Sequence, residues 1–241
     1  MCGRYTLAVP GEVLGELFEL AEVPAVEPRY NIAPTQEAPV VRTRRTAEGP
    51  VRRLDLLRWG LVPWWAEDPG VGARMINARV ESAAERPAYR DAFRRQRCLV
   101  PADGFYEWKP GPGGRQPYWV HRPDGRPFAF AGLWSRWGRD ERRLDSFTIL
   151  TRAAPEGLRE LHDRVPVILQ PEDWAAWLDP SPAEPGDLLA ALARAGGDLV
   201  PRPVGRRVNR PDNDDPALIE AAPEAPAPVI PGLFDVPPTD G

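Results

Sequence analysis

Short strand-like runs separated by turns fill most of this 241-residue chain and constrain its fold more than any other feature. Alternating apolar residues predict strands at 3–8, 38–44, 51–59, 97–101, 104–109, 117–122, 127–133, 144–151 and 165–169. Asp124-Gly125 predicts a hairpin between the sixth and seventh of these strands. Helical patterns are brief, at 11–21 and in parts of 81–95, 171–178 and 186–195. Because no strand–helix–strand repeat occurs, we expect a β-rich α+β fold, mixed or antiparallel, that closes toward a barrel.

The chain is predicted to form one domain over residues 2–220, followed by a disordered tail over 221–241 that is rich in proline, alanine and acidic residues. Its longest clean apolar stretch, Phe128 to Trp134, is far shorter than the ~20 residues of a membrane span, and the start lacks a signal-peptide pattern. Two cysteines form no disulfide framework, which fits a reducing compartment. We therefore expect a cytoplasmic protein, and a monomer.

Cys2 is the residue with the most distinctive chemistry. Removal of Met1, which is common before a small residue, would leave Cys2 with a free α-amine and a thiol on adjacent carbons. The amine titrates near ~8 and the thiol near ~8.5, so part of the amine is a neutral nucleophile at pH 7. Such a pair condenses with an aldehyde to an imine and then closes a thiazolidine ring. The alternative is that Cys2 is only the residue after the start.

Arginine supplies almost all of the positive charge, since only one of the 31 basic residues is a lysine, Lys109. The net charge of −4 argues against a protein that coats nucleic acid nonspecifically. Residues 72–98 nevertheless carry seven arginines against three acidic residues. This segment predicts a groove that binds a phosphate backbone, or alternatively a solvated helix face. Trp64 and Trp65 lie together in a proline-flanked loop, where one of them could stack on a nucleobase, or both could pack against the core.

Glu107 interrupts the aromatic strand Gly-Phe-Tyr-Glu-Trp-Lys. Strand alternation places Phe105, Glu107 and Lys109 on one face and Tyr106 and Trp108 on the other. If the face of Glu107 points inward, burial would raise the pKa of its carboxyl toward general acid–base use. If this face points outward, Glu107 and Lys109 are neighbouring surface charges.

Two other polar residues are candidates for the same site. His162 lies in Leu-His-Asp-Arg-Val-Pro, just before a predicted strand, where loops commonly carry catalytic groups. Asn77 lies among apolar neighbours and can both donate and accept hydrogen bonds, which suits orienting an amine or a sugar oxygen. Each could instead be structural. The second histidine, His121, is predicted to lie on the surface of a hairpin.

No metal or cofactor site is predicted. Cys2, Cys98, His121 and His162 do not show the paired spacings typical of zinc ligands. Cys98, inside Arg-Cys-Leu-Val-Pro, is interpreted as a buried thiol of a strand.

Six sequence blocks together resemble one known family. They are Met-Cys-Gly-Arg-Tyr at 1–5, Arg-Tyr-Asn-Ile-Ala-Pro at 29–34, Arg-Trp-Gly-Leu-Val-Pro-Trp-Trp at 58–65, Ile-Asn-Ala-Arg-Val-Glu at 76–81, Pro-Ala-Asp-Gly-Phe-Tyr-Glu-Trp-Lys at 101–109 and Leu-His-Asp-Arg-Val-Pro at 161–166. This pattern is similar to the SOS-response-associated peptidase family of abasic-site-processing proteins. The resemblance covers residues 2 to about 220, and the tail does not match.

The resemblance implies a function in the response to DNA damage. Such a protein recognises an abasic site in single-stranded DNA and traps its ring-opened aldehyde as a thiazolidine crosslink to the mature N-terminal cysteine, and it would lie on the nucleoid when bound. The implied catalytic residues are Cys2, Asn77, Glu107 and His162. The implied DNA contacts are Arg4, Asn31, Pro34, Trp64, Trp65, Arg79 and Arg164. Two alternatives stay open: a cysteine peptidase that acts through Cys2, at least on its own N-terminus, and a noncovalent single-strand binder. A lyase-like reversal of the crosslink by Glu107 is a further option.

Overall fold

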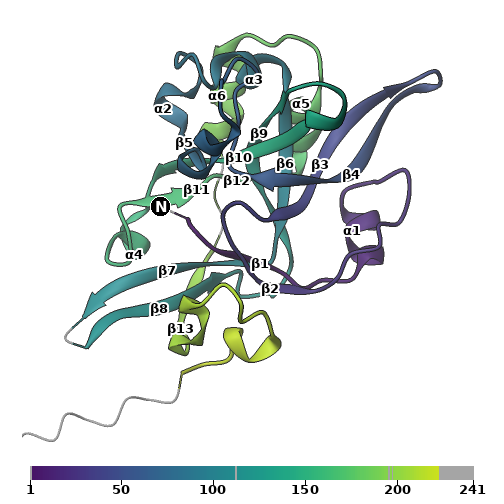
Figure 1. The fold of residues 1–241 in the computed structure, drawn as a ribbon. Coiled ribbons are helices and arrows are strands. Elements are labelled where there is room, and N and C mark those ends of the chain that lie inside the picture. The colour runs from purple at the N-terminus through teal and green to yellow at the C-terminus, as the bar shows by residue number, and fades with distance from the viewer. Residues whose placement is uncertain (1, 112, 195, 197, 223–241) are drawn as a thin grey trace, which may run out of the picture.

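A closed ring of five strands forms the centre of the molecule (Figure 1). The computed structural model describes residues 2–111, 113–194, 196 and 198–222, so the predicted tail lies outside the described residues from residue 223 on. The ring consists of β10 (Leu144–Ala153), β4 (Gly49–Trp59), β3 (Glu37–Thr46), β6 (Arg97–Ala102) and β9 (Phe128–Trp137). It closes because β10 pairs with both β4 and β9, in parallel with β4 and antiparallel with β9. The expected β-rich, barrel-like α+β fold is confirmed.

A second, antiparallel sheet lies beside the ring and has the order β13-β8-β7-β1-β2. Its strands are β1 (Tyr5–Leu7), β2 (Arg29–Ile32), β7 (Gly104–Gly111), β8 (Gly114–His121) and β13 (Val200–Pro203). The chain passes from the ring into this sheet at Asp103, the one residue between β6 and β7. The carboxylate of Asp103 accepts hydrogen bonds from the Thr6 hydroxyl and from the Ala8 backbone N–H, which fixes β1 beside the crossing.

The hairpin predicted at Asp124-Gly125 is wrong, although the turn itself exists. Gly125 has φ 68° and its N–H donates to the Arg122 carbonyl at 3.1 Å. The strands that the turn joins lie in different sheets, since β8 pairs with β7 and β13, whereas β9 pairs with β6, β10 and β12 (Ile168–Leu169). A turn signal reverses the chain locally, but the partner of β9 is chosen by burial on both of its faces.

Three strands escaped the sequence-based prediction: β2, β5 (Asn77–Arg79) and β13. Each has four residues or fewer and no clear alternation. The strand expected at 165–169 is divided into β11 (Arg164–Pro166) and β12.

Helices are short and cover the outside of the ring (Figure 1). They are α1 (Gly11–Leu17), α2 (Val80–Ala83), α3 (Arg90–Arg95), α4 (Glu156–Arg159), α5 (Trp174–Leu178) and α6 (Pro185–Arg194). Five 3₁₀ turns complete the described elements, at Pro69–Arg74, Asp140–Arg142, Pro171–Asp173, Arg206–Asn209 and Pro216–Ile219. In the part of the chain that the structure describes, no helix has the length and apolar character needed to cross a membrane.

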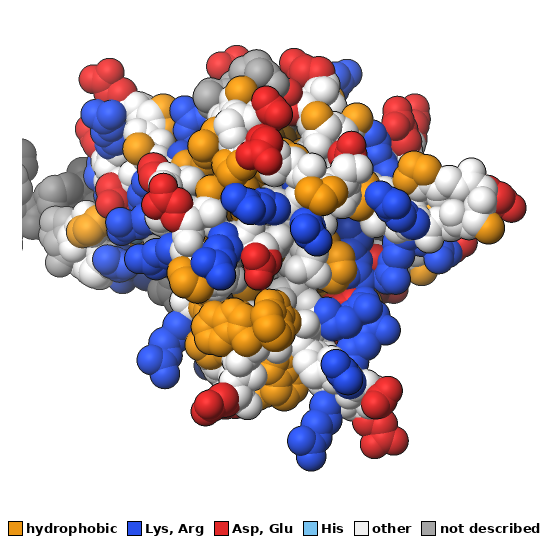
Figure 2. Space-filling model, turned by 90° about the horizontal axis from the view of Figure 1, so that it is seen from above, with side chains coloured by type: hydrophobic (Ala, Val, Ile, Leu, Met, Phe, Trp, Pro, Cys, Tyr) orange, Lys and Arg blue, Asp and Glu red, His pale blue; other side chains and the backbone are white. Residues whose placement is uncertain are grey.

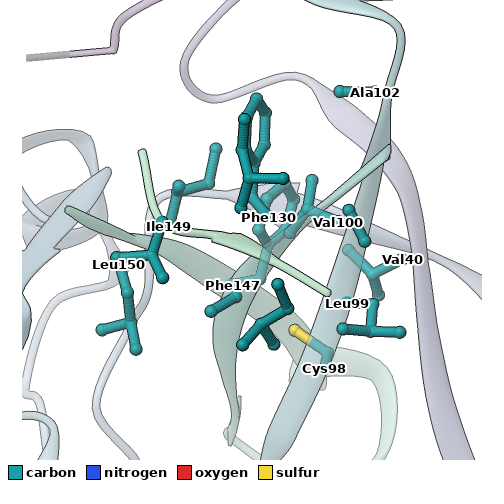
Figure 3. Close-up of a cluster of buried hydrophobic side chains, with 14 of the residues drawn as sticks. Val40, Cys98, Leu99, Val100, Ala102, Phe130, Phe147, Ile149 and Leu150 are labelled. Atoms are coloured by element: carbon teal, nitrogen blue, oxygen red, sulfur yellow. The ribbon is translucent and has the colours of Figure 1, made fainter. Parts of the chain in front are cut away.

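The ring interior is filled by aliphatic and aromatic side chains, as Figure 3 shows for Val40, Val100, Phe130 and Phe147. Cys98 is fully buried among them, as predicted. The sulfur leaves so little room at Gly132 that a Cβ there would lie 2.7 Å from it, which explains why this position lacks a side chain.

His121 is buried, so the prediction of a surface histidine is wrong. Its ring stacks on the indole of Trp119 with centroids 4.1 Å apart. Burial lowers the pKa of His121, so the ring is neutral at pH 7.

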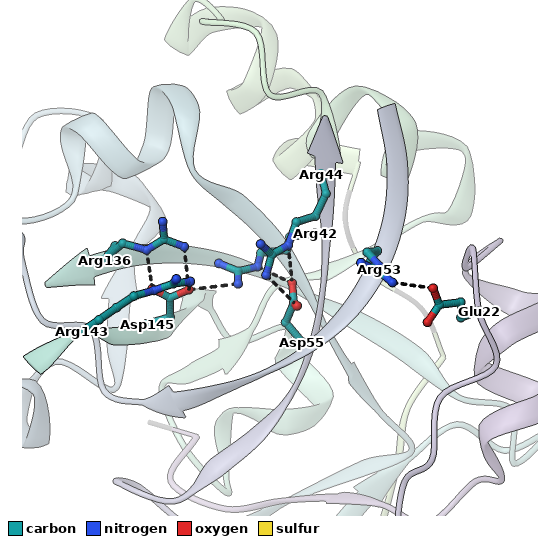
Figure 4. A network of polar contacts seen from close by, with 8 residues as sticks. All are labelled: Glu22, Arg42, Arg44, Arg53, Asp55, Arg136, Arg143 and Asp145. Atoms are coloured by element: carbon teal, nitrogen blue, oxygen red, sulfur yellow. Dashed lines mark hydrogen bonds and ion pairs between the residues drawn. The ribbon is translucent and has the colours of Figure 1, made fainter. Parts of the chain in front are cut away.

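Outside the apolar core, a network of arginines and aspartates joins four strands of the ring (Figure 4). Asp145 accepts hydrogen bonds from Arg42, Arg136 and Arg143, while Asp55 accepts from Arg42 and Arg44. Burial alone would raise the pKa of Asp145, but the three guanidinium groups outweigh it and hold that pKa well below its ordinary value. The side chain of Arg42 is only 4% exposed, so both carboxylates compensate a charge that water does not reach.

Candidate active site around Cys2

Cys2 is held in place at both its carbonyl and its thiol. The side-chain amide of Asn77 donates to the Cys2 carbonyl oxygen at 2.7 Å, and the thiol donates to the Arg4 carbonyl with a sulfur–oxygen distance of 3.7 Å. Asn77 begins β5, which pairs in parallel with β10, so the ring positions this amide. Its other polar atom, Oδ1, is buried and has no hydrogen-bond partner among the described residues. An acceptor is therefore available beside Cys2.

Glu107 brings a buried carboxyl to the same place. It lies on β7, which pairs with β1 through Tyr5 and Phe105, and its residue is only 4% exposed, so of the two orientations that the sequence left open the structure has the inward one. Burial raises the pKa of Glu107 to about 7. The carboxyl therefore exchanges a proton near neutral pH, as a general acid–base group must.

The thiol of Cys2 is fully buried. Burial raises its pKa strongly, and the nearby charge of Glu107 raises it further. Cys2 therefore carries a neutral thiol at pH 7, in contrast to the thiolate that cysteine nucleophiles present when their pKa is lowered.

His162 lies between α4 and β11, and its Nδ1 accepts a hydrogen bond from the Arg164 backbone N–H at 2.9 Å. Burial lowers the pKa of His162, and Asp163 acts in the opposite direction. The pKa values of His162 and Glu107 both respond to the charges of Asp163 and Arg115, which places the two groups in one electrostatic environment. Arg115 was missed by the sequence analysis because only the pairing of β7 with β8 brings it there.

Two of the expected DNA contacts take part in the fold. Arg4 donates to the Asn31 side-chain oxygen and to the Val208 carbonyl, both at 2.9 Å. Asn31 is fully buried, and its amide donates to carbonyls of the segment 208–213. These side chains therefore fix the late part of the chain against β1 and β2.

Arg79 and Arg164 lie at the ends of β5 and β11, close to Asn77 in the sheet. Arg79 is exposed, whereas the guanidinium of Arg164 forms two hydrogen bonds with Glu81, at 2.7 and 2.8 Å, and one with the Thr151 carbonyl at 2.5 Å. Arg79 thus presents its charge to solvent, while Arg164 links β11, α2 and β10.

Trp64 and Trp65 lie on the surface and are 64% and 51% exposed, so packing of both against the core is excluded. Trp64 borders a groove of about 580 Å³ together with Asp91, Arg94, Arg95 and Gln96 of the arginine-rich segment. Figure 2 shows the face above α2, α3 and α6, where basic side chains lie on either side of an apolar patch and acidic ones also border it. Pro34 is half-buried in a turn whose next residue, Thr35, donates its N–H to the Trp59 carbonyl at 2.8 Å.

The described residues contain no group of three or more His, Cys, Asp or Glu side chains placed to hold a metal ion. Asn77 and Glu107 bring an amide and a carboxyl to Cys2, and the imidazole of His162 shares the electrostatic environment of Glu107. Together with a neutral thiol they can move protons and orient an amine, which is what condensation with a carbonyl compound requires.

Comparison with known proteins identifies the family. The family described as SOS response associated peptidase (SRAP) matches residues 1–211. The abasic site processing protein YoqW of Bacillus subtilis is 39% identical over 228 residues, which cover 92% of this chain and 100% of YoqW. The abasic site processing protein YedK of Escherichia coli is 31% identical, with coverage of 91% and 99%. A crystal structure of a protein from Bacteroides thetaiotaomicron shares the fold, with a TM-score of 0.76, 20% identity, and coverage of 92% of this chain and 100% of that one. The chain therefore belongs to the SOS response associated peptidase family.

Proposed function

We propose that this protein processes abasic sites in single-stranded DNA by forming a covalent thiazolidine crosslink through Cys2 after removal of Met1. The observation that carries the proposal is the position of Cys2, whose carbonyl is held by Asn77 at 2.7 Å beside the buried carboxyl of Glu107. The names of YoqW and YedK as abasic site processing proteins support the choice of substrate.

The reaction would begin at the amine rather than at the sulfur, because burial keeps the thiol protonated. The α-amine of Cys2 attacks C1′ of the ring-opened sugar, and the resulting carbinolamine loses its hydroxyl as water to give an imine. Glu107 donates the proton that this water needs. The nitrogen keeps its remaining hydrogen, so the imine is protonated at this stage. The carboxylate of Glu107 then takes the proton of the thiol as the sulfur adds to the imine carbon, so Glu107 is restored and the product has the mass of protein plus DNA minus one water.

Asn77 and His162 would serve this sequence without forming bonds to the sugar. The buried oxygen of Asn77 offers an acceptor for an N–H of the amine, which would direct the lone pair of the nitrogen toward C1′. His162, with its lowered pKa, is a neutral base at pH 7 that can assist opening of the sugar ring.

Single-stranded DNA would lie across the face that carries Arg79, Trp64 and the groove of Arg94 and Arg95. Exposed indoles stack on bases, and arginines bind phosphates through a planar fork of donors. Arg4, Asn31 and Arg164 would support this surface through the fold, and Pro34 and Trp65 would shape its wall. We further propose that the protein acts as a monomer in the cytoplasm, on the nucleoid when bound to DNA.

The main alternative is a cysteine peptidase that acts through Cys2, which the family description suggests. A peptidase requires an activated thiolate, and the raised pKa of the Cys2 thiol opposes this. The two functions differ in a simple requirement, since the crosslink needs the α-amine and a peptidase does not.

The test is intact mass spectrometry of protein whose loss of Met1 has been verified, after incubation with an oligonucleotide that carries one abasic site and then heating. We expect a heat-stable adduct that Cys2→Ala abolishes, while Cys2→Ser leaves only a labile imine. Cys98→Ala is the matched control and should retain the adduct. Absence of an adduct from the verified mature protein, together with proteolysis that survives blocking of the amine, would favour the peptidase.

A further inference from the structure

One ion pair connects the two segments that carry the candidate acid–base groups. The ammonium of Lys109, on β7, lies 2.7 Å from Glu160 Oε2, directly after α4. Lys109 follows Glu107 by two residues, and Glu160 precedes His162 by two residues. We propose that Lys109 and Glu160 are a positioning pair that sets the distance between Glu107 and His162 during crosslink formation. This inference rests on the proposed function.

On the β7 side, the strand geometry couples the pair to the site. Residues two apart in a strand share a face and lie ~7 Å apart along it, so Lys109 and Glu107 project from the same side of the strand. The face changes from buried at Glu107 to half-exposed at Lys109, whose side chain is 39% exposed. Lys109 therefore lies where the buried part of the site opens to solvent.

On the other side, the pair holds a short segment. α4 contains four residues. The buried side chains of Leu158, in α4, and Leu161, just after it, fix this segment to the core. The His162 backbone N–H donates to the Leu158 carbonyl at 3.2 Å, so His162 moves with this turn. Figure 1 shows α4 next to β7, on the side of the β7–β8 hairpin that faces the N-terminus, so the ion pair joins the strand that carries Glu107 to the turn that precedes His162.

The charge of Lys109 excludes it as a second imine-forming amine. Glu160 raises the pKa of Lys109 by hydrogen bonding and charge, and Lys109 lowers that of Glu160 in return. A protonated amine has no lone pair for an aldehyde. Because both groups are exposed, the pair adds little to the stability of the fold, which suits a positioning role.

The experiment compares four proteins: wild type, Lys109→Glu, Glu160→Lys and the swapped double variant. Crosslinking rates are measured at saturating DNA, together with the Kd for the same oligonucleotide and the dependence of rate on pH. The matched control is the corresponding exchange at Arg53, on β4, and Glu22, five residues after α1, which form another exposed ion pair. Formation of the wild-type adduct establishes the proposed function first, so failure of the two ideas is distinguishable.

We expect each single variant to slow crosslinking by about fivefold at most, the size of an exposed pair, with Kd and melting temperature unchanged. The double variant should recover to within about twofold of wild type, and the control exchange should have no effect. The pH dependence of the rate should change in the single variants and return in the double variant, which a purely structural role would not produce.

Two results would overturn the proposal. Equal rates in all four proteins would show that the pair does not position the site. A weaker Kd for Lys109→Glu that the double variant fails to restore would show that Lys109 binds a DNA phosphate instead. If Lys109→Glu lowers the melting temperature, Lys109→Gln takes its place in the comparison. Lys109→Arg keeps the positive charge and should crosslink at the wild-type rate.

Discussion

At the scale of single residues, the proposed reaction of Cys2 depends most on Glu107. Its pKa of about 7 results from burial, and in the proposed mechanism this value would let one carboxyl act first as an acid toward the carbinolamine and then as a base toward the thiol. Neutral pH is therefore the condition in which both forms are available.

The rate of crosslinking should show a bell-shaped dependence on pH. It should rise as the α-amine loses its proton toward ~8 and fall as Glu107 loses its proton above about 7. Glu107→Gln should lower the rate at pH 7 by ~10²-fold and remove the decline that Glu107 causes. Rapid-quench kinetics between pH 5 and pH 9 would measure both. A wild-type decline that persists in Glu107→Gln would assign it to another group.

Asn77→Ala should slow crosslinking by about tenfold, because one hydrogen bond of ~1–1.5 kcal/mol no longer holds the Cys2 carbonyl. The binding of DNA without an abasic site should not change. Single-turnover rates and fluorescence anisotropy would separate these effects. Asn213→Ala is the control, since that amide donates to the Arg207 carbonyl within the C-terminal segment. Equal losses in both variants would indicate general destabilisation.

The sequence indicated the candidate catalytic residues around Cys2, but it did not indicate the hydrogen-bond partners of the residues near them. Glu107 and Asn77 are recognisable because each is a polar residue among apolar ones, and the family resemblance assigned their roles. The internal contacts of Arg4 and Asn31 could not be predicted, because their partners near Val208 lie more than 170 residues away.

At the scale of elements, the ion pairs of the arginine–aspartate network link the strands of the ring to one another. Arg42 of β3, Asp55 of β4, Asp145 of β10 and Arg136 of β9 form one connected set. Arg42 and Asp145 come from β3 and β10, two strands that are brought together because both pair with β4.

Asp145→Asn should lower the free energy of unfolding by about 3 kcal/mol, since the buried guanidinium of Arg42 would keep only the half-buried Asp55 as a counterion. The folded-state pKa of Asp145 lies below its ordinary value of ~3.9, so its contribution is present above pH ~4 and is lost as pH falls further. Urea titrations at pH 7 and below pH 4 would measure this, and the acid-induced loss should be smaller in the variant.

The control for this experiment is Asp124→Asn, which removes an exposed ion pair with Arg122. The side chain of Arg122 is 35% exposed and that of Asp124 is 40% exposed. Its effect should stay below ~1 kcal/mol. If the two substitutions changed the free energy of unfolding equally, the burial of Arg42 would not increase the contribution of its ion pairs to stability.

The sequence predicted the positions of the long strands correctly, but it did not predict which strands pair with each other. β3, β4, β9 and β10 have clear apolar patterns, and the structure places each of them within a few residues of its expected range. β5 has three residues and forms because β10 offers an edge beside it, which no local pattern records. The partners of β8 and β9 were mispredicted for the same reason, since pairing is decided by the whole sheet.

At the scale of the whole molecule, charge is distributed unevenly. The chain has a net charge of −4, yet the groove beside Trp64 is bordered by Arg94 and Arg95. A protein with this distribution attracts a DNA strand at one face and repels it elsewhere.

Binding of single-stranded DNA should weaken steeply with salt. Each phosphate that is neutralised contributes about −0.7 to the slope of log K against log salt, so Arg94→Ala with Arg95→Ala should reduce the slope by about 1.4. Fluorescence anisotropy between 50 and 300 mM salt would provide these slopes. Arg45→Ala, at the outer end of the β3–β4 hairpin, is the control and should leave the slope unchanged. A slope that does not change in the double variant would place the strand elsewhere.

The crossing at Asp103 limits how the length of this chain can change during evolution. Because one residue forms the entire connection between β6 and β7, an inserted residue cannot be absorbed in a loop and must shift the register of one strand. A shift of one residue in β7 exchanges its two faces, which would turn Glu107 away from Cys2 and bring an aromatic neighbour in its place. Length changes are therefore tolerable in open turns such as the one near Glu48, whereas a deletion or insertion at Asp103 would disrupt both the packing of β7 and the candidate site.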